Sequence, residues 1–141
     1  MTEVTGGAVR LSVVIACRDA AATLAEQLTA LAAQPCPVPW EVLLCDDRSR
    51  DGGPELARRL AAELGDRLPL RVLDVAAPGG RGAARNAGAA RARGSWLAFC
   101  DADDVVADDY LARMCAALTR HAFVAARVEP AAIVFISHHR L

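Results

Sequence analysis

Four short, mostly apolar runs recur at intervals of about thirty residues, and they constrain the fold more than any other feature of the sequence. The runs are Leu11–Ala16, Trp40–Cys45, Leu70–Val75 and Trp96–Cys100. The first is continuous and rich in β-branched residues, which favours a strand buried on both faces of a sheet. Strands that alternate with helices form right-handed β-α-β units, so the chain is predicted to be an α/β protein with a mainly parallel sheet and flanking helices.

The connections between these runs carry helical signals. Leu24, Leu28 and Leu31 have the spacing of one helix face, and Thr23 with Glu26 predicts a capping box at the start of that helix. The other predicted elements are a helix from Pro54 to Gly65, a small-residue helix over Gly82–Arg93, a helix with Asp108 and Asp109 in its first turn that ends near His121, and a strand at Ala131–Ile136.

The composition excludes several functions. All 16 basic residues are arginine, which rules out Schiff-base chemistry and the phosphate-binding loop that ends in Gly-Lys-Ser/Thr. Aromatic residues make up only 4% of the chain, so we do not expect it to bind nucleic acid by base stacking. A length of 141 residues favours a single domain.

The cysteines and the apolar segments bear on cellular location. Five cysteines without a C-x-x-C pair are typical of reduced, buried thiols rather than of disulfides or a zinc site. Residues 1–10 lack the apolar run of a signal peptide, and no segment approaches the roughly 18 apolar residues of a membrane span. We therefore expect a cytoplasmic chain without a transmembrane segment.

Acidic residues follow two of the predicted strands. Asp46 and Asp47 follow the second strand, and Asp101, Asp103 and Asp104 follow the fourth. Ligands of open parallel sheets bind beyond the carboxyl ends of the strands, so we expect these carboxylates to converge at one edge. Crowded carboxylates repel one another, and an oxygen-only ligand set favours Mg²⁺ or Mn²⁺ shared with a substrate's phosphates.

Arginines are predicted to approach the same edge. Arg81 and Arg85 are four residues apart near the start of the small-residue helix, where backbone amides and the helix dipole attract anions. Guanidinium groups bind phosphate in a bidentate manner, so this pair favours a phosphate-containing ligand. Asp51, Asp108 and Asp109 are instead predicted to be caps or solvated charges at helix starts.

Other classes with acidic pairs on a parallel sheet fit less well. A dinucleotide-binding fold requires G-x-G-x-x-G after the first strand, where this chain has Cys17-Arg18-Asp19-Ala20. A two-component receiver domain requires a lysine beside its acidic pocket, and the chain has none. A non-catalytic nucleotide-binding or interaction module remains an alternative, because binding requires fewer residues than turnover.

Four successive segments resemble the motifs of family 2 glycosyltransferases in their order and spacing. They begin at Leu11-Ser12-Val13-Val14-Ile15 and continue with Trp40 to Gly52, Gly82 to Gly88, and Phe99-Cys100-Asp101-Ala102-Asp103-Asp104. The resemblance covers residues 10–121 and implies a Rossmann-like GT-A fold, a nucleoside-diphosphate sugar donor and Mn²⁺ or Mg²⁺. It also implies inverting transfer to an acceptor hydroxyl, carried by an unknown glycan, lipid or small molecule.

The resemblance further implies roles for individual residues. Asp46 and Asp47 resemble the acids that contact the base or ribose of the nucleotide, and Arg85 resembles the family's basic contact to the nucleotide. Asp101 resembles the residue near the ribose and the metal, and Asp103 resembles the direct metal ligand.

The sequence departs from the family pattern at several positions. Asp19 stands where Asn is usual, Ala16 where Pro is common, and Arg48 where Gly often follows the acidic pair. Residues 1–9 are expected to be a tail, and residues 122–141 remain unassigned. The family's catalytic base lies downstream of the Asp-x-Asp segment, so we expect it beyond the end of this chain. The alternative is a catalytically inactive module left by truncation.

Overall fold

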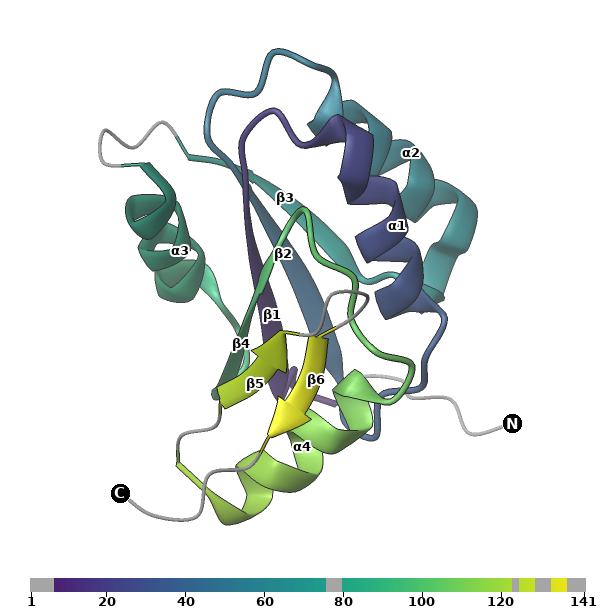
Figure 1. Cartoon of the computed structure of the whole chain (residues 1–141), viewed down its shortest axis with the longest axis vertical. Coiled ribbons are helices and arrows are strands. Elements are labelled where there is room, and N and C mark those ends of the chain that lie inside the picture. The colour runs from purple at the N-terminus through teal and green to yellow at the C-terminus, as the bar shows by residue number, and fades with distance from the viewer. Residues whose placement is uncertain (1–6, 76–79, 123–124, 129–132, 137–141) are drawn as a thin grey trace.

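A computed structural model describes residues 7–75 and 80–122 in full, and the backbone of 125–128 and 133–136. Within these residues the four predicted strands form one parallel sheet in the order β3-β2-β1-β4, and β5 and β6 form a separate antiparallel pair (Figure 1). The strands are β1 (Leu11–Cys17), β2 (Trp40–Asp46), β3 (Leu70–Asp74), β4 (Trp96–Asp101), β5 (Ala125–Val128) and β6 (Ile133–Ile136). The helices are α1 (Ala21–Ala32), α2 (Gly53–Leu64), α3 (Gly80–Arg91) and α4 (Tyr110–Arg120), with a short 3₁₀ turn at Gly65–Arg67.

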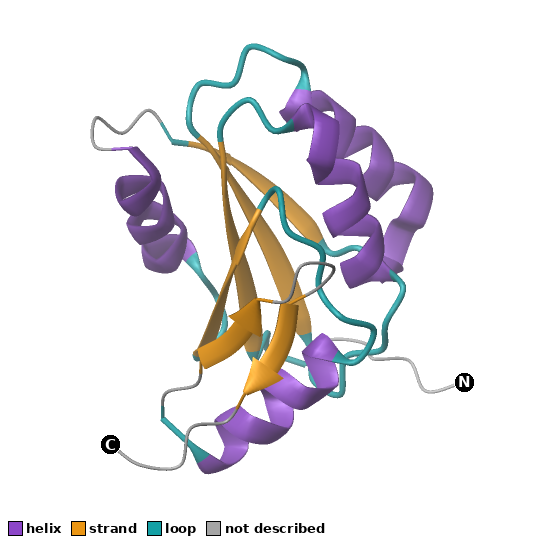
Figure 2. Ribbon diagram, in the orientation of Figure 1, coloured by secondary structure: helices purple, strands orange, loops and turns teal. Residues whose placement is uncertain are grey.

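The sheet is covered on both faces, which confirms the α/β prediction. Helix α3 lies on one face, and α1 and α2 lie on the other (Figure 2). Side chains of β1 alternate between the two faces: Val13 and Ile15 pack in the larger core with α1 and α4, and Val14 packs in the smaller core with α3. All three are fully buried, and this two-sided burial is the reason that β1 reads as a continuous apolar run.

The predicted capping box is wrong. Helix α1 begins at Ala21, and the Thr23 hydroxyl donates to the carbonyl oxygens of Ala20 and Ala102 rather than capping the helix. The Ala21 amide instead donates to Asp51 Oδ2 over 2.8 Å, while Asp51 Oδ1 accepts from the Gly53 amide over 3.0 Å. Asp51 is therefore a cap, as predicted, and it serves the starts of both α1 and α2.

The C-terminal elements also differ in detail from the prediction. Helix α4 begins at Tyr110, so Asp108 and Asp109 lie before its first turn, and the Asp109 carboxylate pairs with Arg113 over 3.5 Å. Strand β6 falls inside the predicted strand Ala131–Ile136, whose first two residues lie outside the described residues. Strand β5, which pairs with it, was not predicted. Helix α3 begins two residues earlier than expected, at Gly80.

Close packing of α3 on the sheet depends on Gly88. A Cβ atom at this position would lie 2.5 Å from Cys45 Sγ and 2.7 Å from Val14 Cγ1, both on buried strands. A Cβ atom at Gly82, in the first turn of the same helix, would meet nothing within 4 Å.

We therefore expect Gly88→Ala to destabilise the protein by about 1–3 kcal/mol, because the core must shift to admit the methyl group. Gly82→Ala is the matched control and should be neutral or stabilising by up to about 1 kcal/mol, because alanine favours the helix. Urea unfolding measures both values. A Gly88→Ala protein as stable as the Gly82→Ala protein would contradict this packing.

A buried carboxylate joins the amino ends of the strands. Glu41 is 3% exposed and accepts hydrogen bonds from Ser12 Oγ (2.9 Å), Arg71 NH1 (2.8 Å) and the Arg93 amide (2.8 Å). Burial alone would raise the pKa of Glu41, but these donors, Arg71 foremost, hold the pKa below its ordinary value. The charged form of Glu41 therefore stabilises the fold.

Glu41→Gln should lower the free energy of unfolding at pH 7 by about 1–3 kcal/mol, because the charge-assisted bond to Arg71 is lost. A lowered pKa contributes stability above the unfolded-state value of about 4.3 and loses it as the pH falls through the folded-state value. The difference between wild type and variant should therefore shrink below about pH 4. Urea unfolding across this range tests the expectation, and a difference that grows on acidification would contradict it.

Candidate functional site

The carboxyl ends of β1, β2 and β4 and the start of α3 surround a pocket of about 540 Å³. Parallel register creates this convergence: Cys17 at the end of β1 pairs with Asp46 of β2, and Ala16 pairs with Asp101 of β4. Asp46 and Asp101, which are more than fifty positions apart in the sequence, therefore lie on either side of the end of β1. The pocket is lined by Ala16, Cys17, Arg18, Asp19, Ala20, Ala22, Thr23, Asp47, Gly80, Arg81, Ala84, Asp101, Ala102 and Asp103.

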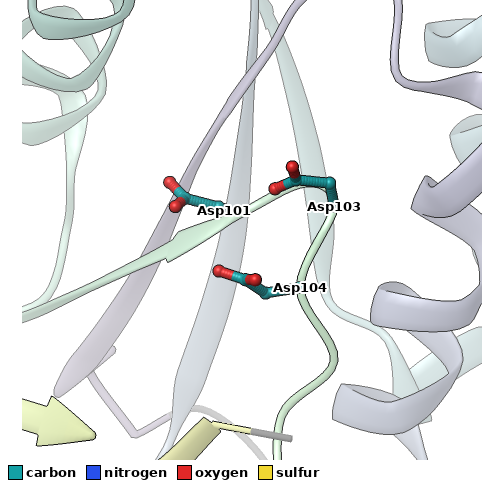
Figure 3. A group of neighbouring side chains, drawn as sticks. All are labelled: Asp101, Asp103 and Asp104. Atoms are coloured by element: carbon teal, nitrogen blue, oxygen red, sulfur yellow. The ribbon is translucent and has the colours of Figure 1, made fainter. Parts of the chain in front are cut away.

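Three carboxylates lie together at the end of β4. Asp101, Asp103 and Asp104 each offer an oxygen atom, and these atoms lie within 4.8 Å of one another (Figure 3). Asp103 is exposed, and the other two are half-buried. Burial, followed by the negative charges of Asp101 and Asp103, raises the pKa of Asp104 above its ordinary value. An all-oxygen donor set in which the charges repel one another fits a hard divalent cation such as Mg²⁺ or Mn²⁺.

Helix α3 brings a positive charge to this cluster. Arg85 NH2 donates to Asp101 Oδ1 over 2.6 Å, and both side chains are about one-third exposed. Arg85 Nε is buried and has no hydrogen-bond partner among the described residues. Arg81, one turn earlier, is exposed and lines the pocket. The two arginines that were predicted to share a helix face thus differ: Arg85 pairs with the acidic cluster, and Arg81 faces the open pocket.

The acidic pair Asp46 and Asp47, at the end of β2, is buried. Asp47 is 3% exposed, and its carboxylate accepts from Arg48 Nε over 2.9 Å and lies 3.7 Å from Arg18 NH1. Asp46 Oδ2 accepts from the Ser49 amide, whereas Asp46 Oδ1 is buried without a partner among the described residues. A buried acceptor without a donor is costly, so Asp46 Oδ1 is suited to an N–H or O–H group of a ligand.

The structure gathers most of the predicted site residues at one place. Asp47, Asp101 and Asp103 line the pocket. Arg85 is not a lining residue but contacts Asp101, and Asp46 lies next to Asp47 and opposite Cys17 in the sheet. Sequence reasoning did not select Arg18, Asp19 or Thr23 as site residues, although Arg18 and Asp19 directly follow β1. Their position just after a parallel strand was the available signal.

Two residues that depart from the family pattern, Asp19 and Arg48, adopt a left-handed backbone conformation. Asp19 has φ of 50° and Arg48 has φ of 56°, and these are the non-glycine residues with positive φ in the described part of the chain. Asn and Gly adopt this region more readily than other residues, which explains why they are usual at these two positions. The loops are tied together, because Asp19 Oδ1 accepts from the Arg50 amide over 2.7 Å and Ser49 Oγ accepts from the Asp19 amide over 2.9 Å.

This fold and this site define an α/β domain of the GT-A type. Residues 12–135 match the model of glycosyl transferase family 2, and the chain belongs to that family. The match extends beyond residue 121, where the resemblance was expected to end, and includes β5 and all but the last residue of β6. No helix in the described part of the chain has the length and apolar character needed to cross a membrane.

Relatives and solved structures agree with this assignment. The succinoglycan biosynthesis protein ExoO of Rhizobium meliloti (strain 1021) is 41% identical over 101 residues, which are 72% of this chain and 27% of that protein. S. aureus TarS 1–349 has a TM-score of 0.69 and 26% identity, covering 81% of this chain and 33% of that one. Structures of that fragment are known with UDP and with UDP-GlcNAc.

A third similar protein is the mannosyltransferase PcManGT from Pyrobaculum calidifontis, whose structure contains GDP-Man and Mn²⁺. Its TM-score is 0.62 and its identity is 29%, over 71% of this chain and 29% of that one. The chain therefore spans a third or less of the length of each of these three proteins.

Proposed function

We propose that this chain forms the donor-binding part of an inverting family 2 glycosyltransferase, which binds a nucleoside-diphosphate sugar together with Mn²⁺ or Mg²⁺. The observation that carries the proposal is the cluster of Asp101, Asp103 and Asp104 beside a pocket that also contains Arg81. Carboxylates next to a phosphate-binding arginine suit a ligand that combines a divalent cation with a diphosphate.

In this proposal Asp101 and Asp103 hold the metal, and Asp104 completes the cluster. Arg85 keeps Asp101 in place and balances part of its charge, since the two side chains are joined by a 2.6 Å ion pair. When bound, the metal would neutralise negative charge on the departing diphosphate. The exposed guanidinium of Arg81 would contact the phosphates from the start of α3.

The acidic pair at the end of β2 would receive the nucleoside. Asp46 Oδ1 has no donor among the described residues and Asp47 lines the pocket, so a base or ribose would supply the missing N–H or O–H group. Transfer with inversion also needs a base that takes the proton from the acceptor hydroxyl. We assign that role to none of the described residues. The acceptor would be a glycan, a lipid or a small molecule.

Metal binding provides the first test. Asp103→Asn should weaken Mn²⁺ binding by about tenfold or more, because a ligand charge is lost from the cluster. The signal of free Mn²⁺ in electron paramagnetic resonance measures this affinity. Asp109→Asn is the matched control: it removes an exposed carboxylate a few residues away that pairs with Arg113, and Mn²⁺ affinity should not change. Equal affinity of the two variants would contradict the metal site.

Nucleotide binding provides the second test. Calorimetric titration with UDP and with GDP should show heat that depends on Mn²⁺, and Asp103→Asn should abolish this dependence. Asp47→Asn should weaken nucleotide binding by roughly 1–3 kcal/mol without affecting Mn²⁺ affinity. No metal-dependent heat with either nucleotide would overturn the proposed function. An interaction module without a donor site would give that null result, whereas binding without transfer is expected of a donor-binding part.

A further inference from the structure

One amide side chain on α1, that of Gln27, contacts both ends of the acidic segment, which is residues 101–106. Gln27 is fully buried, and its Nε2 donates to the carbonyl oxygen of Asp101 over 3.2 Å. Its Oε1 accepts from the amide of Val106 over 2.9 Å. Gln27 therefore bridges the first and last residues of the segment 101–106, which contains all three clustered carboxylates.

Two further side chains contact this part of the chain: Thr23 on α1, and Gln34 just beyond the end of that helix. One turn before Gln27, Thr23 Oγ1 donates to the carbonyl oxygen of Ala102 over 3.0 Å. Two residues beyond the end of α1, Gln34 Nε2 donates to the carbonyl oxygen of Ala107 over 3.0 Å, and Gln34 Oε1 accepts from the Leu111 amide over 2.7 Å. Thr23 and Gln27 thus hold the acidic segment, and Gln34 holds the start of α4.

The acidic segment needs such support from outside. Its three carboxylates repel one another, and the turn within it is closed by a 3.3 Å bond from the Asp104 amide to the Asp101 carbonyl oxygen. A buried amide can hold the backbone at both ends without adding charge beside the cluster. A glutamate could not donate to the Asp101 carbonyl oxygen and would add a fourth negative charge.

We propose that Gln27, assisted by Thr23, is a positioning residue that holds the backbone of residues 101–106 so that the carboxylates converge on a divalent cation. This inference rests on the metal site proposed above. In it, hydrogen bonds from α1 to the backbone of the acidic segment fix the orientation of the carboxylates that would bind the metal. Such contacts are worth about 10–100-fold in metal affinity.

The test compares Gln27→Leu with Gln34→Leu. Each variant replaces a buried glutamine by a residue of similar size and removes its contacts to the backbone. Gln27 donates one hydrogen bond and accepts one, and Gln34 donates two and accepts one. Both should lower the melting temperature measured in chelator. Only Gln27→Leu should also weaken Mn²⁺ binding, by about tenfold or more, whereas Gln34→Leu should bind Mn²⁺ as wild type does.

Thr23→Val is a milder variant that keeps the shape of the side chain and removes only its hydroxyl, so it decides the question if Gln27→Leu does not fold. It should weaken Mn²⁺ binding in the same direction by a smaller factor. If the Gln27 and Thr23 variants bind Mn²⁺ as tightly as Gln34→Leu, their role is structural and the inference is overturned. If wild type itself does not bind Mn²⁺, the metal site fails first, and the inference fails with it.

Discussion

The parallel pairing of β1 with β2 on one side and β4 on the other decides where the polar groups of this protein meet. Strand β1 is buried on both faces, with Val13 and Ile15 in the larger core and Val14 in the smaller one. The register of this pairing sets Asp46 opposite Cys17 and Asp101 opposite Ala16. The acidic residues converge because β2 and β4 both run parallel to β1 and end beside its last two residues.

The two ends of the sheet hold carboxylates in opposite ways. At the amino ends, Glu41 is surrounded by donors, its pKa is lowered, and its role is to join strands and loops. At the carboxyl ends, polar groups are left without partners: Asp46 Oδ1 and Arg85 Nε are buried and unpaired within the described residues, and the pKa of Asp104 is raised. Unsatisfied buried donors and acceptors are typical of functional sites, whereas a satisfied network stabilises the fold.

Most of the fold, and the place of several residues that line the pocket, could be predicted from the sequence. The four strands were predicted to within one residue because two-sided burial leaves a continuous apolar signal. Asp47, Asp101 and Asp103 were expected at one edge of the sheet because they follow the predicted strands, and they line the pocket there. The cap of α1 was wrong because its true acceptor, Asp51, lies thirty positions away. Gln27 could not be singled out, because a glutamine among leucines on a helix looks like an ordinary polar residue until its partners are known.

The sequence by itself determined the order of strands and helices, the residue types at the strand ends and the membership of family 2, since these depend on local pattern and on motif order. Only the tertiary structure decided which carboxylates share one cluster, which of Arg81 and Arg85 pairs with it, and which helix holds the acidic segment. The physical reason is that hydrogen bonds and ion pairs act over about 3 Å, and the partners here are separated by up to 79 positions in the chain.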